Sequence, residues 1–355
     1  MSRTFTVGVT RDLEPTTGAT TLDALGLRTL GEEPGVQWDF VGSLAGELTP
    51  DSIRACNAVI LLGPTVTART LSQAERLCLI ARWGVGTNNI DIDACTDAGV
   101  IVTITPEAVR RPVASGAMAF ILALAHRVVD KDRVARAGGW GKRLDTLGTG
   151  LAGRVLGVVG LGNVGRELLA LTRPFDMRRL AADPYVSPRA VQDAGATPVD
   201  LDELLGAADV VCLTCALTPE TYHLIDAPRL ARMRPEAVLV NVARGGLVDQ
   251  TALVHALRTN TIRAAALDTL DPEPPADDDP ILGLDNVLLA PHSIAWTTEL
   301  AHGNTTACCR AILDLLAGKA PRHLVNPAVL TSPLLRDKLV HNAIIRASSD
   351  PEVTP

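Results

Sequence analysis

Three side chains in the second half of the sequence have the types needed to reduce a ketone beside a carboxylate. Arg244 offers a planar cation that can orient the substrate, His292 can carry a proton, and Glu273 can favour the charged form of that histidine. Each follows an apolar run typical of a buried strand. Because an open α/β sheet binds ligands at the carboxyl ends of its strands, we expect the three to converge. Taken singly, Arg244 could be a turn residue, Glu273 a solvated residue of an acidic loop, and His292 a structural or exposed histidine.

A glycine-rich loop earlier in the chain has the spacing of a dinucleotide-binding turn. Gly160, Gly162 and Gly165 stand between an apolar run at 156–159 and an amphipathic stretch at 164–173. The first glycine permits a tight turn, the second lets the backbone approach a pyrophosphate, and the third lets helix and strand pack closely. Phosphates then lie against free N–H groups at a helix N-terminus, so no lysine cluster is needed.

The cofactor type depends on the end of the next expected strand. Asp183 stands there, and its carboxylate can accept hydrogen bonds from the adenosine ribose while repelling a 2′-phosphate. Arg189 follows a few residues later and could weaken that preference. The sequence predicts NAD as the cofactor.

Short apolar runs alternate with helical patterns along most of the chain, which indicates parallel, doubly wound sheets. We expect strands at 5–10, 36–41, 58–62, 79–82 and 100–103, and then at 155–160, 179–183, 209–214, 237–242, 264–268 and 286–290. Helices are expected around 20–30, 50–56, 72–77, 92–98, 113–137, 165–173, 201–206, 249–258 and 297–316. The tail after Pro327 matches no pattern.

Composition excludes several other classes of protein. The 355 residues carry a formal net charge of −7, which offers no basic surface for nucleic acid or anionic lipid. The start lacks the apolar core of a signal peptide, and no uninterrupted apolar run reaches membrane-spanning length, so we expect a cytoplasmic protein. Cys212 and Cys215 read as small apolar residues of a strand, with side chains on opposite faces, and we expect no metal site.

Several long motifs resemble those of the D-isomer-specific 2-hydroxyacid dehydrogenases. They occupy residues 156–165, 217–221, 241–249, 265–274 and 286–292, with weaker matches at 84–91 and 111–114. The resemblance implies a flavodoxin-like substrate domain (residues 1–107 and 296–355) and a Rossmann NAD-binding domain (residues 108–295), with a cleft between them. It also implies a homodimer joined through the nucleotide domains, near residues 113–137.

The resemblance assigns roles to individual residues. It makes Arg244, Glu273 and His292 catalytic, with His292 as the general acid and base. The expected cofactor contacts are Gly160, Gly162, Asn163, Val164, Gly165, Asp183, Thr214, Ala243 and Asp268. The expected substrate contacts are Trp83, Gly84, Val85, Gly86, Arg244 and Trp296.

Some positions depart from the family pattern and leave alternatives open. Thr214 and Ala216 replace a frequent His and Pro, Ser115 replaces a frequent Glu, and Trp296 stands where small residues are common. Together with the Asp-Pro-Tyr stretch at 183–185 and the Pro-Glu-Pro-Pro stretch at 272–275, these features resemble the branch that contains C-terminal-binding-protein-like bacterial dehydrogenases. The leading hypothesis is interconversion of a 2-keto acid and a D-2-hydroxy acid. An NAD-binding regulator or corepressor-like protein and a phosphite dehydrogenase remain alternatives, whereas formate dehydrogenases usually carry glutamine at the position of Glu273.

Overall fold

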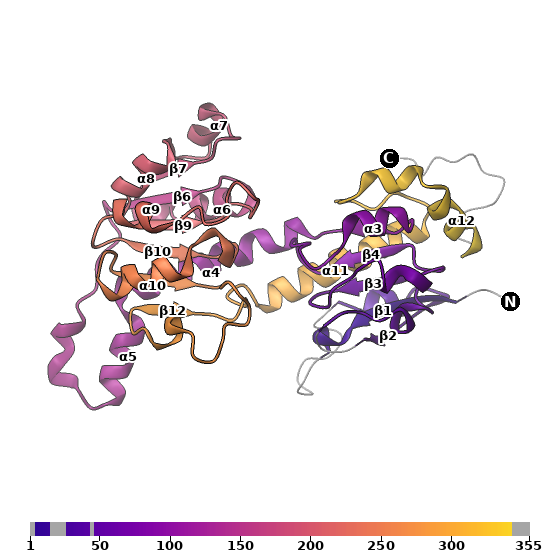
Figure 1. The fold of residues 1–355 in the computed structure, drawn as a ribbon, viewed down its shortest axis with the longest axis horizontal. Helices are drawn as coiled ribbons and strands as arrows, with labels where there is room; N and C mark the ends of the chain where they lie inside the picture. Colours follow the sequence, from indigo (N-terminus) through magenta and orange to yellow (C-terminus); the bar gives the residue numbers. More distant parts are fainter. Residues whose placement is uncertain (1–3, 15–25, 43–45, 343–355) are drawn as a thin grey trace. The chain divides into compact units, whose positions relative to one another are not determined.

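The computed structural model describes residues 4–14, 26–42 and 46–342. The chain forms two compact units (Figure 1). One combines Met1–Val109 with Thr297–Pro355, and the other is Arg110–Trp296. The first expected helix, at 20–30, lies partly outside the described residues.

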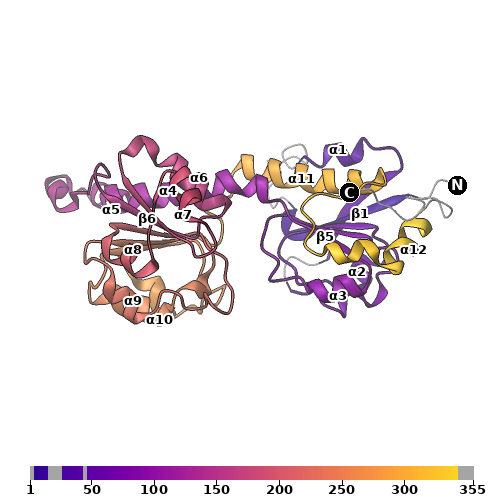
Figure 2. The same cartoon turned by 90° about the horizontal axis from the view of Figure 1, so that it is seen from above.

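The first unit is built on a parallel five-stranded sheet in the order β2-β1-β3-β4-β5. These strands are β1 (Phe5–Thr10), β2 (Val36–Val41), β3 (Ala58–Leu61), β4 (Leu79–Arg82) and β5 (Ile101–Thr103). Helices α1 (Arg28–Gly31) and α11 (Thr298–Leu316) cover one face, and α2 (Pro50–Ile53), α3 (Ile92–Asp97) and α12 (Pro333–His341) cover the other (Figure 2). The strand order is that of flavodoxin-like folds.

The second unit contains a parallel seven-stranded sheet in the order β12-β11-β10-β9-β6-β7-β8. The strands are β6 (Val155–Val159), β7 (Arg178–Ala182), β8 (Thr197–Pro198), β9 (Val210–Leu213), β10 (Val238–Asn241), β11 (Ala264–Leu267) and β12 (Val287–Leu289). The order reverses between β6 and β9, which is the point where doubly wound folds bind nucleotides. Together the two sheets confirm the predicted fold class.

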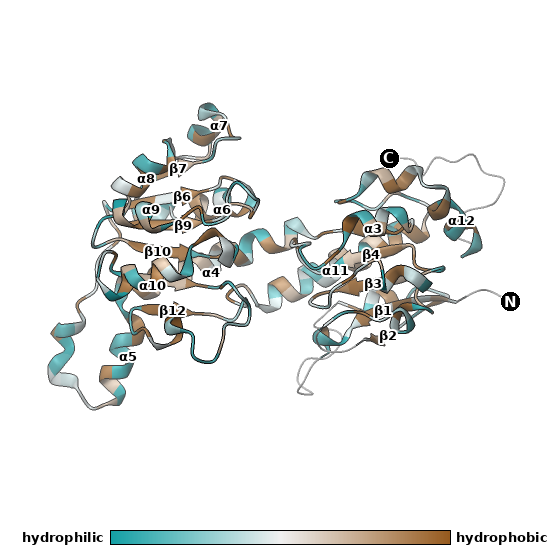
Figure 3. Cartoon of the chain, in the orientation of Figure 1, coloured by the Kyte–Doolittle hydropathy of each residue, from teal (hydrophilic) through white to brown (hydrophobic). Residues whose placement is uncertain are grey.

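Helices cover both faces of this second sheet. Helices α4 (Pro106–His126), α6 (Asn163–Leu171) and α7 (Pro188–Asp193) pack on one face, and α8 (Leu201–Ala207), α9 (Ala227–Arg232) and α10 (Gln250–Arg258) pack on the other. The strands are almost entirely apolar and the outer helix surfaces polar (Figure 3). That pattern is expected when both faces of a parallel sheet are buried.

The long helix expected at 113–137 is wrong as a single element. The structure has two helices, α4 and α5 (Val128–Arg136), which are separated by Arg127 at a φ of 52°. A residue in the left-handed region cannot continue an α-helix, so the chain turns there. Helix α4 begins earlier than expected and contains Pro112.

Helix α4 is also the one described helix that is long and apolar enough to cross a membrane, judged by length and composition alone. Of its apolar window, 56% is buried inside the structure. Burial of that kind is typical of the core helix of a globular domain.

The unplaced C-terminal tail belongs to the first unit. Residues Pro327–Thr331 form a 3-10 turn that leads into α12. The Asn326 side chain accepts from the Val102 N–H at 2.9 Å and donates to the Val100 carbonyl at 2.9 Å. The Lys338 ammonium donates to the carbonyls of Leu77 and Ala98, at 3.0 and 2.7 Å. Local periodicity could not predict these contacts, because their partners are more than 200 residues away in sequence.

The expected helix at 72–77 is also wrong. The structure has only a 3-10 turn, Thr70–Gln73. Helices α7 and α9, of six residues each, were not expected.

Candidate active site

The three expected catalytic side chains lie at the carboxyl edge of the second sheet. Arg244 follows β10, Glu273 follows β11, and His292 follows β12. These strands are adjacent and parallel, so their following loops emerge side by side. The structure therefore brings the predicted trio to one edge of the sheet.

His292 and Glu273 form a direct pair. The Nδ1 atom of His292 lies 2.9 Å from the Glu273 Oε2 atom. The other Glu273 oxygen accepts from the backbone N–H of Leu270 at 2.9 Å. Both side chains are partly exposed, at 50% and 39%. With Nδ1 directed at the carboxylate, the Nε2 atom is the histidine nitrogen available for proton transfer.

Opposing influences set the charge of Glu273. Burial alone would raise its pKa, but the hydrogen bond from His292, the positive charge of His292, the Leu270 N–H and the Arg244 charge outweigh burial. The net effect lowers the pKa of Glu273 below its ordinary value, so the carboxylate stays ionised. Burial lowers the pKa of Arg244, and the charge of Glu273 opposes that shift.

Asp268 fixes the loop that carries His292 through hydrogen bonds to its backbone. One Asp268 oxygen, Oδ1, accepts from the N–H groups of Ser293 and Ile294 at 2.8 and 2.9 Å. The Asp268 carbonyl accepts from the His292 N–H at 2.8 Å. His292 itself has a φ of 53°, a conformation that only surrounding contacts can maintain for a residue other than glycine. Burial raises the pKa of Asp268, although these two N–H bonds oppose it.

Asp268 was expected to contact the cofactor. The structure shows that its Oδ1 atom orders the His292 loop, and contact with the cofactor stays a prediction.

Arg244 is positioned by Asn241, a residue that sequence reasoning did not single out. The buried Asn241 side chain donates to the Arg244 carbonyl at 2.8 Å and accepts from the Ala243 N–H at 3.0 Å. Gly245 packs so closely that a Cβ there would lie 1.9 Å from the Leu270 carbonyl oxygen. The sequence signal was present, because a polar Asn at the end of an apolar strand needs partners.

The glycine-rich loop has two tight positions and one open one. A Cβ on Gly160, whose φ is +91°, would lie 2.5 Å from the Cys215 Cα, and one on Gly165 would lie 2.3 Å from the Gly160 carbonyl oxygen. A Cβ on Gly162 would meet nothing within 4 Å. The outer glycines therefore serve chain packing, whereas Gly162 borders open space that a close-lying ligand can use.

Helix α6 begins at this loop without a side-chain cap. Its N-cap residue is Gly162, whereas α7, α8, α9 and α10 are capped by Ser187, Asp200, Asp226 and Asp249. Asn163 and Val164 occupy the first turn, whose N–H groups have no acceptor within the helix. An uncapped N-terminus beside open space suits an anionic group such as a pyrophosphate.

Asp183 holds the loop, and its contact with the cofactor ribose stays a prediction. Its Oδ2 atom accepts from the Leu161 N–H at 2.7 Å, and Oδ1 accepts from the Tyr185 N–H at 2.9 Å. Each carboxylate oxygen keeps capacity for a further donor. Arg189 pairs with Asp193 at 3.1 Å, so its charge is directed along its own helix.

Thr214 closes the other side of the loop. Its N–H donates to the Val159 carbonyl at 2.9 Å and its hydroxyl to the Gly160 carbonyl at 2.6 Å. Cys212 and Cys215 are both free thiols, and burial raises their pKa values to about 12 and about 11. Among the described residues no group of His, Cys, Asp and Glu could hold a metal ion.

The remaining expected substrate contacts follow β4 in the first unit. Trp83 and Gly84 are buried, whereas Val85 is exposed. Gly84 has a φ of 132°, which favours glycine at that turn. Trp296, the last residue of the second unit, is 56% exposed. The part these residues play in substrate binding stays a prediction.

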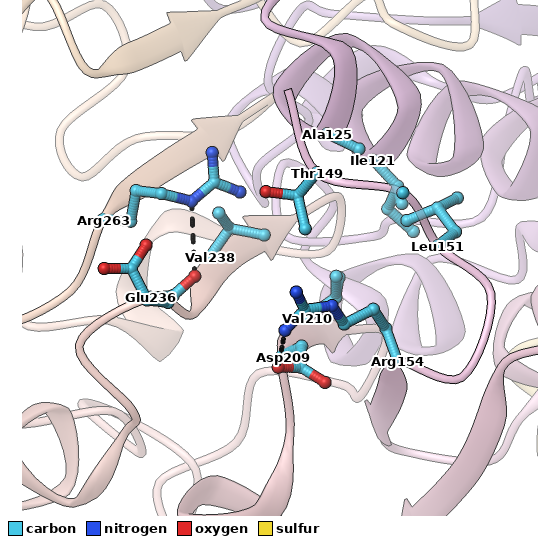
Figure 4. A pocket seen from close by; sticks show the side chains of 11 residues that line it. Ile121, Ala125, Thr149, Leu151, Arg154, Asp209, Val210, Glu236, Val238 and Arg263 are labelled. Carbon is cyan, nitrogen blue, oxygen red and sulfur yellow. Dashed lines mark hydrogen bonds and ion pairs between the residues drawn. The ribbon is translucent and has the colours of Figure 1, made fainter. Parts of the chain in front are cut away.

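A separate cavity of about 70 Å³ lies at the opposite edge of the second sheet (Figure 4). Its charged residues precede the strands. Arg154 pairs with Asp209 at 3.3 Å, and Arg263 donates to the carbonyls of Glu236 and Leu124 at 3.3 and 3.4 Å. The cavity is too small for a dinucleotide. Its charged groups form hydrogen bonds and an ion pair where α4 packs against the sheet.

Comparison with known proteins agrees with this geometry. Residues 118–293 match the family model described as D-isomer specific 2-hydroxyacid dehydrogenase, NAD binding domain. The chain is 36% identical over 313 residues to a glyoxylate reductase of Thermococcus onnurineus, covering 86% of this chain and 93% of that protein. It is 38% identical over 269 residues to a D-3-phosphoglycerate dehydrogenase of Methanocaldococcus jannaschii, covering 76% of this chain but only 51% of that protein.

Among solved structures, the TT0316 protein of Thermus thermophilus matches with a TM-score of 0.77 and 32% identity. The match covers 90% of this chain and all of that one. The predicted cofactor is confirmed as NAD. The chain belongs to the D-isomer-specific 2-hydroxyacid dehydrogenases, and it is an NAD-dependent enzyme that acts on CH–OH donors.

Proposed function

We propose that the enzyme reduces a short 2-keto acid to the 2-hydroxy acid, of D configuration where the product is chiral, with glyoxylate, which gives achiral glycolate, as the first candidate. The observation that carries this proposal is the 2.9 Å pair between His292 and Glu273, with Arg244 on the adjacent strand end. Glyoxylate is named first because the relatives that match along most of their length are called glyoxylate reductases.

In this mechanism the residues of the chain supply orientation and a proton. The loop at Gly160–Gly165, with Asp183, would hold NAD, which supplies the hydride when reduced. Arg244 presents a fork of donors suited to the substrate carboxylate and carbonyl oxygen. The Nε2 atom of His292 donates a proton to the carbonyl oxygen during reduction and accepts it during oxidation. Glu273 holds the ring by Nδ1 and so directs Nε2 away from the carboxylate.

We propose further that the loop of residues 83–86 binds the substrate carboxylate through backbone N–H groups. Within the described ranges, the N–H groups of Val85 and Gly86 donate to no protein acceptor. Two adjacent free N–H groups form a concave donor pair that suits a carboxylate. Trp296 is proposed to contact the substrate side chain.

A substrate panel tests this function. NADH oxidation would be followed with glyoxylate, hydroxypyruvate, pyruvate, 2-ketobutyrate and 3-phosphohydroxypyruvate. The highest kcat/KM is expected with an unphosphorylated short acid. No turnover with any of them would refute the assignment and favour an NAD-binding regulator. A preference for 3-phosphohydroxypyruvate would place the chain with the phosphoglycerate dehydrogenases, of which it spans about half.

We also propose that the chain forms a homodimer through its second unit. Helix α5 and the following 3-10 segment Trp140–Thr146 project from that unit (Figure 1). This projecting segment exposes large apolar side chains, with Trp140 at 70%, Leu144 at 79% and Leu147 at 77% exposure. Contiguous exposed apolar side chains of this size are typical of protein interfaces.

A further inference from the structure

The loop of residues 83–86 is anchored by a buried polar network. The Gly84 N–H is shared between the Thr105 hydroxyl and the Arg82 carbonyl, each at 2.9 Å, and the Thr105 N–H donates to the Gly84 carbonyl at 2.9 Å. The Trp83 indole N–H donates to the Thr305 hydroxyl at 2.9 Å. These bonds join the loop after β4 to the start of α4 and to the middle of α11.

The Thr105 hydroxyl is itself oriented by a second residue. It donates its proton to the Asn304 Oδ1 atom at 2.7 Å, and Thr105 and Asn304 are 3% and 1% exposed. A hydroxyl has one proton, so donation to Asn304 leaves a lone pair to accept from Gly84. The chain of donors therefore runs in one direction, from Gly84 through Thr105 to Asn304.

Two carbonyls of the loop, those of Trp83 and Gly86, accept hydrogen bonds from a side chain of the same unit. The Arg82 guanidinium donates to the carbonyls of Gly86, at 2.7 Å, and of Trp83. With both carbonyls and the Gly84 N–H engaged inside the unit, the loop's remaining donors are the N–H groups of Val85 and Gly86.

We propose that Thr105 and Asn304 are positioning residues for the substrate carboxylate. Their hydrogen bonds keep Gly84 at its positive φ of 132°. The conformation of Gly84 in turn sets the direction of the N–H groups of Val85 and Gly86. The inference rests on the proposed role of the loop in carboxylate binding. Neither side chain touches the substrate, and both act through the Gly84 peptide.

The test compares Thr105→Val, Thr105→Ser and the control Thr70→Val. Valine keeps the volume of Thr105 but removes the hydroxyl that accepts from the Gly84 N–H and donates to the Asn304 carbonyl, so the Gly84 N–H keeps only its bond to the Arg82 carbonyl. Serine keeps the hydroxyl. Thr70 is a buried threonine of the same unit with a hydrogen-bonded hydroxyl, and it lies in the 3-10 turn Thr70–Gln73, with hydroxyl partners outside the loop. The parent and the three variants would be assayed for Tm, NADH affinity, and kcat and KM with glyoxylate.

Thr105→Val should raise KM by roughly 10- to 50-fold, the loss expected when one hydrogen bond to a charged group is weakened. Its kcat should stay within about threefold and its NADH affinity should be unchanged, because the proposed cofactor loop, Gly160–Gly165, belongs to the second unit. Thr105→Ser should stay within about threefold of the parent in KM. Thr70→Val should lower Tm without moving KM. An unchanged KM in Thr105→Val, or an equal rise in Thr105→Ser, would overturn the proposal.

Amide hydrogen exchange separates this inference from the proposed function. In the protein without ligands, Thr105→Val should speed exchange of the Gly84 amide, and Thr70→Val should not. Unchanged exchange in Thr105→Val overturns the positioning role even if the parent enzyme is active. Absence of turnover in the parent protein, with faster exchange in Thr105→Val, supports the network while refuting the substrate assignment.

Discussion

The contrast among the loop glycines gives a prediction about cofactor binding that does not depend on the substrate. Gly162→Ala adds a Cβ that meets nothing within 4 Å, and Gly162 has an ordinary negative φ of −76°. The substituted chain should therefore fold as the parent does. If the pyrophosphate of NADH packs against this residue, the same methyl group occupies the space it needs.

The expected size follows from the contacts that would be lost. A backbone hydrogen bond to a charged group is worth about 1.5–3 kcal/mol, so displacing one should weaken NADH binding roughly 10- to 150-fold. Gly160→Ala differs in kind, because its φ is +91° and its Cβ would lie 2.5 Å from the Cys215 backbone. A left-handed conformation costs about 1–2 kcal/mol and overpacking about 1–3, so that variant should lose about 2–5 kcal/mol of stability.

The assay is a pair of measurements on each variant: Tm without ligand, and the Kd of NADH from fluorescence titration. Gly162→Ala should keep its Tm within about 2 °C, whereas Gly160→Ala should lose roughly 4–20 °C. Gly206→Ala is the matched control, because its Cβ also meets open space but on the surface of α8. NADH affinity in Gly162→Ala equal to that of Gly206→Ala would refute the placement of the pyrophosphate at this loop.

Four further results are expected. His292→Ala should lower kcat by about 10²–10⁴-fold while leaving the Kd of NADH nearly unchanged, and lost NADH affinity with preserved turnover would contradict its proton-transfer role. The folded pKa of Glu273 lies below its ordinary value, so its ionic contribution to stability is present above that ordinary value and disappears as pH falls through the folded one. The Tm difference between the parent and Glu273→Gln should therefore be present at pH 7 and vanish in acid, and a difference that grows in acid would reverse this assignment. Asp183→Ala should narrow the preference for NADH over NADPH in kcat/KM, and an unchanged ratio would remove Asp183 from the ribose site. Trp140→Ser with Leu144→Ser should shift sedimentation from dimer to monomer, and a parent that sediments as a monomer would exclude the proposed interface.

The sequence predicted the sheets better than the helices, for a physical reason. Strands of a doubly buried parallel sheet are uninterrupted apolar runs, and such runs are visible without tertiary information. Helix α7 has six residues and shows no period, and the break between α4 and α5 depends on one left-handed residue, Arg127. Tertiary contacts decide both features.

At the site, chemistry-bearing residues were predicted but their supports were not. Arg244, Glu273 and His292 were predicted because their types suit reduction of a 2-keto acid, because each follows an apolar strand, and because the surrounding motifs resemble those of a known family. Asn241 looked like the end of a strand, although its amide fixes the turn that presents Arg244. Thr105 and Asn304 lie about 200 residues apart, so no local pattern could have paired them.

Burial separates the residues that position the site from those proposed to react. Asp268, Asn241 and Asn304 are each at least 94% buried, and each uses its side chain to satisfy backbone N–H groups or a hydroxyl of a neighbouring loop. A buried polar side chain with such partners is costly to remove, because its loss leaves those partners unsatisfied. His292 and Glu273, by contrast, are partly exposed and engage each other. Substitution of the buried supports should therefore reduce stability and activity together, whereas substitution of the exposed pair should reduce activity with a smaller effect on stability.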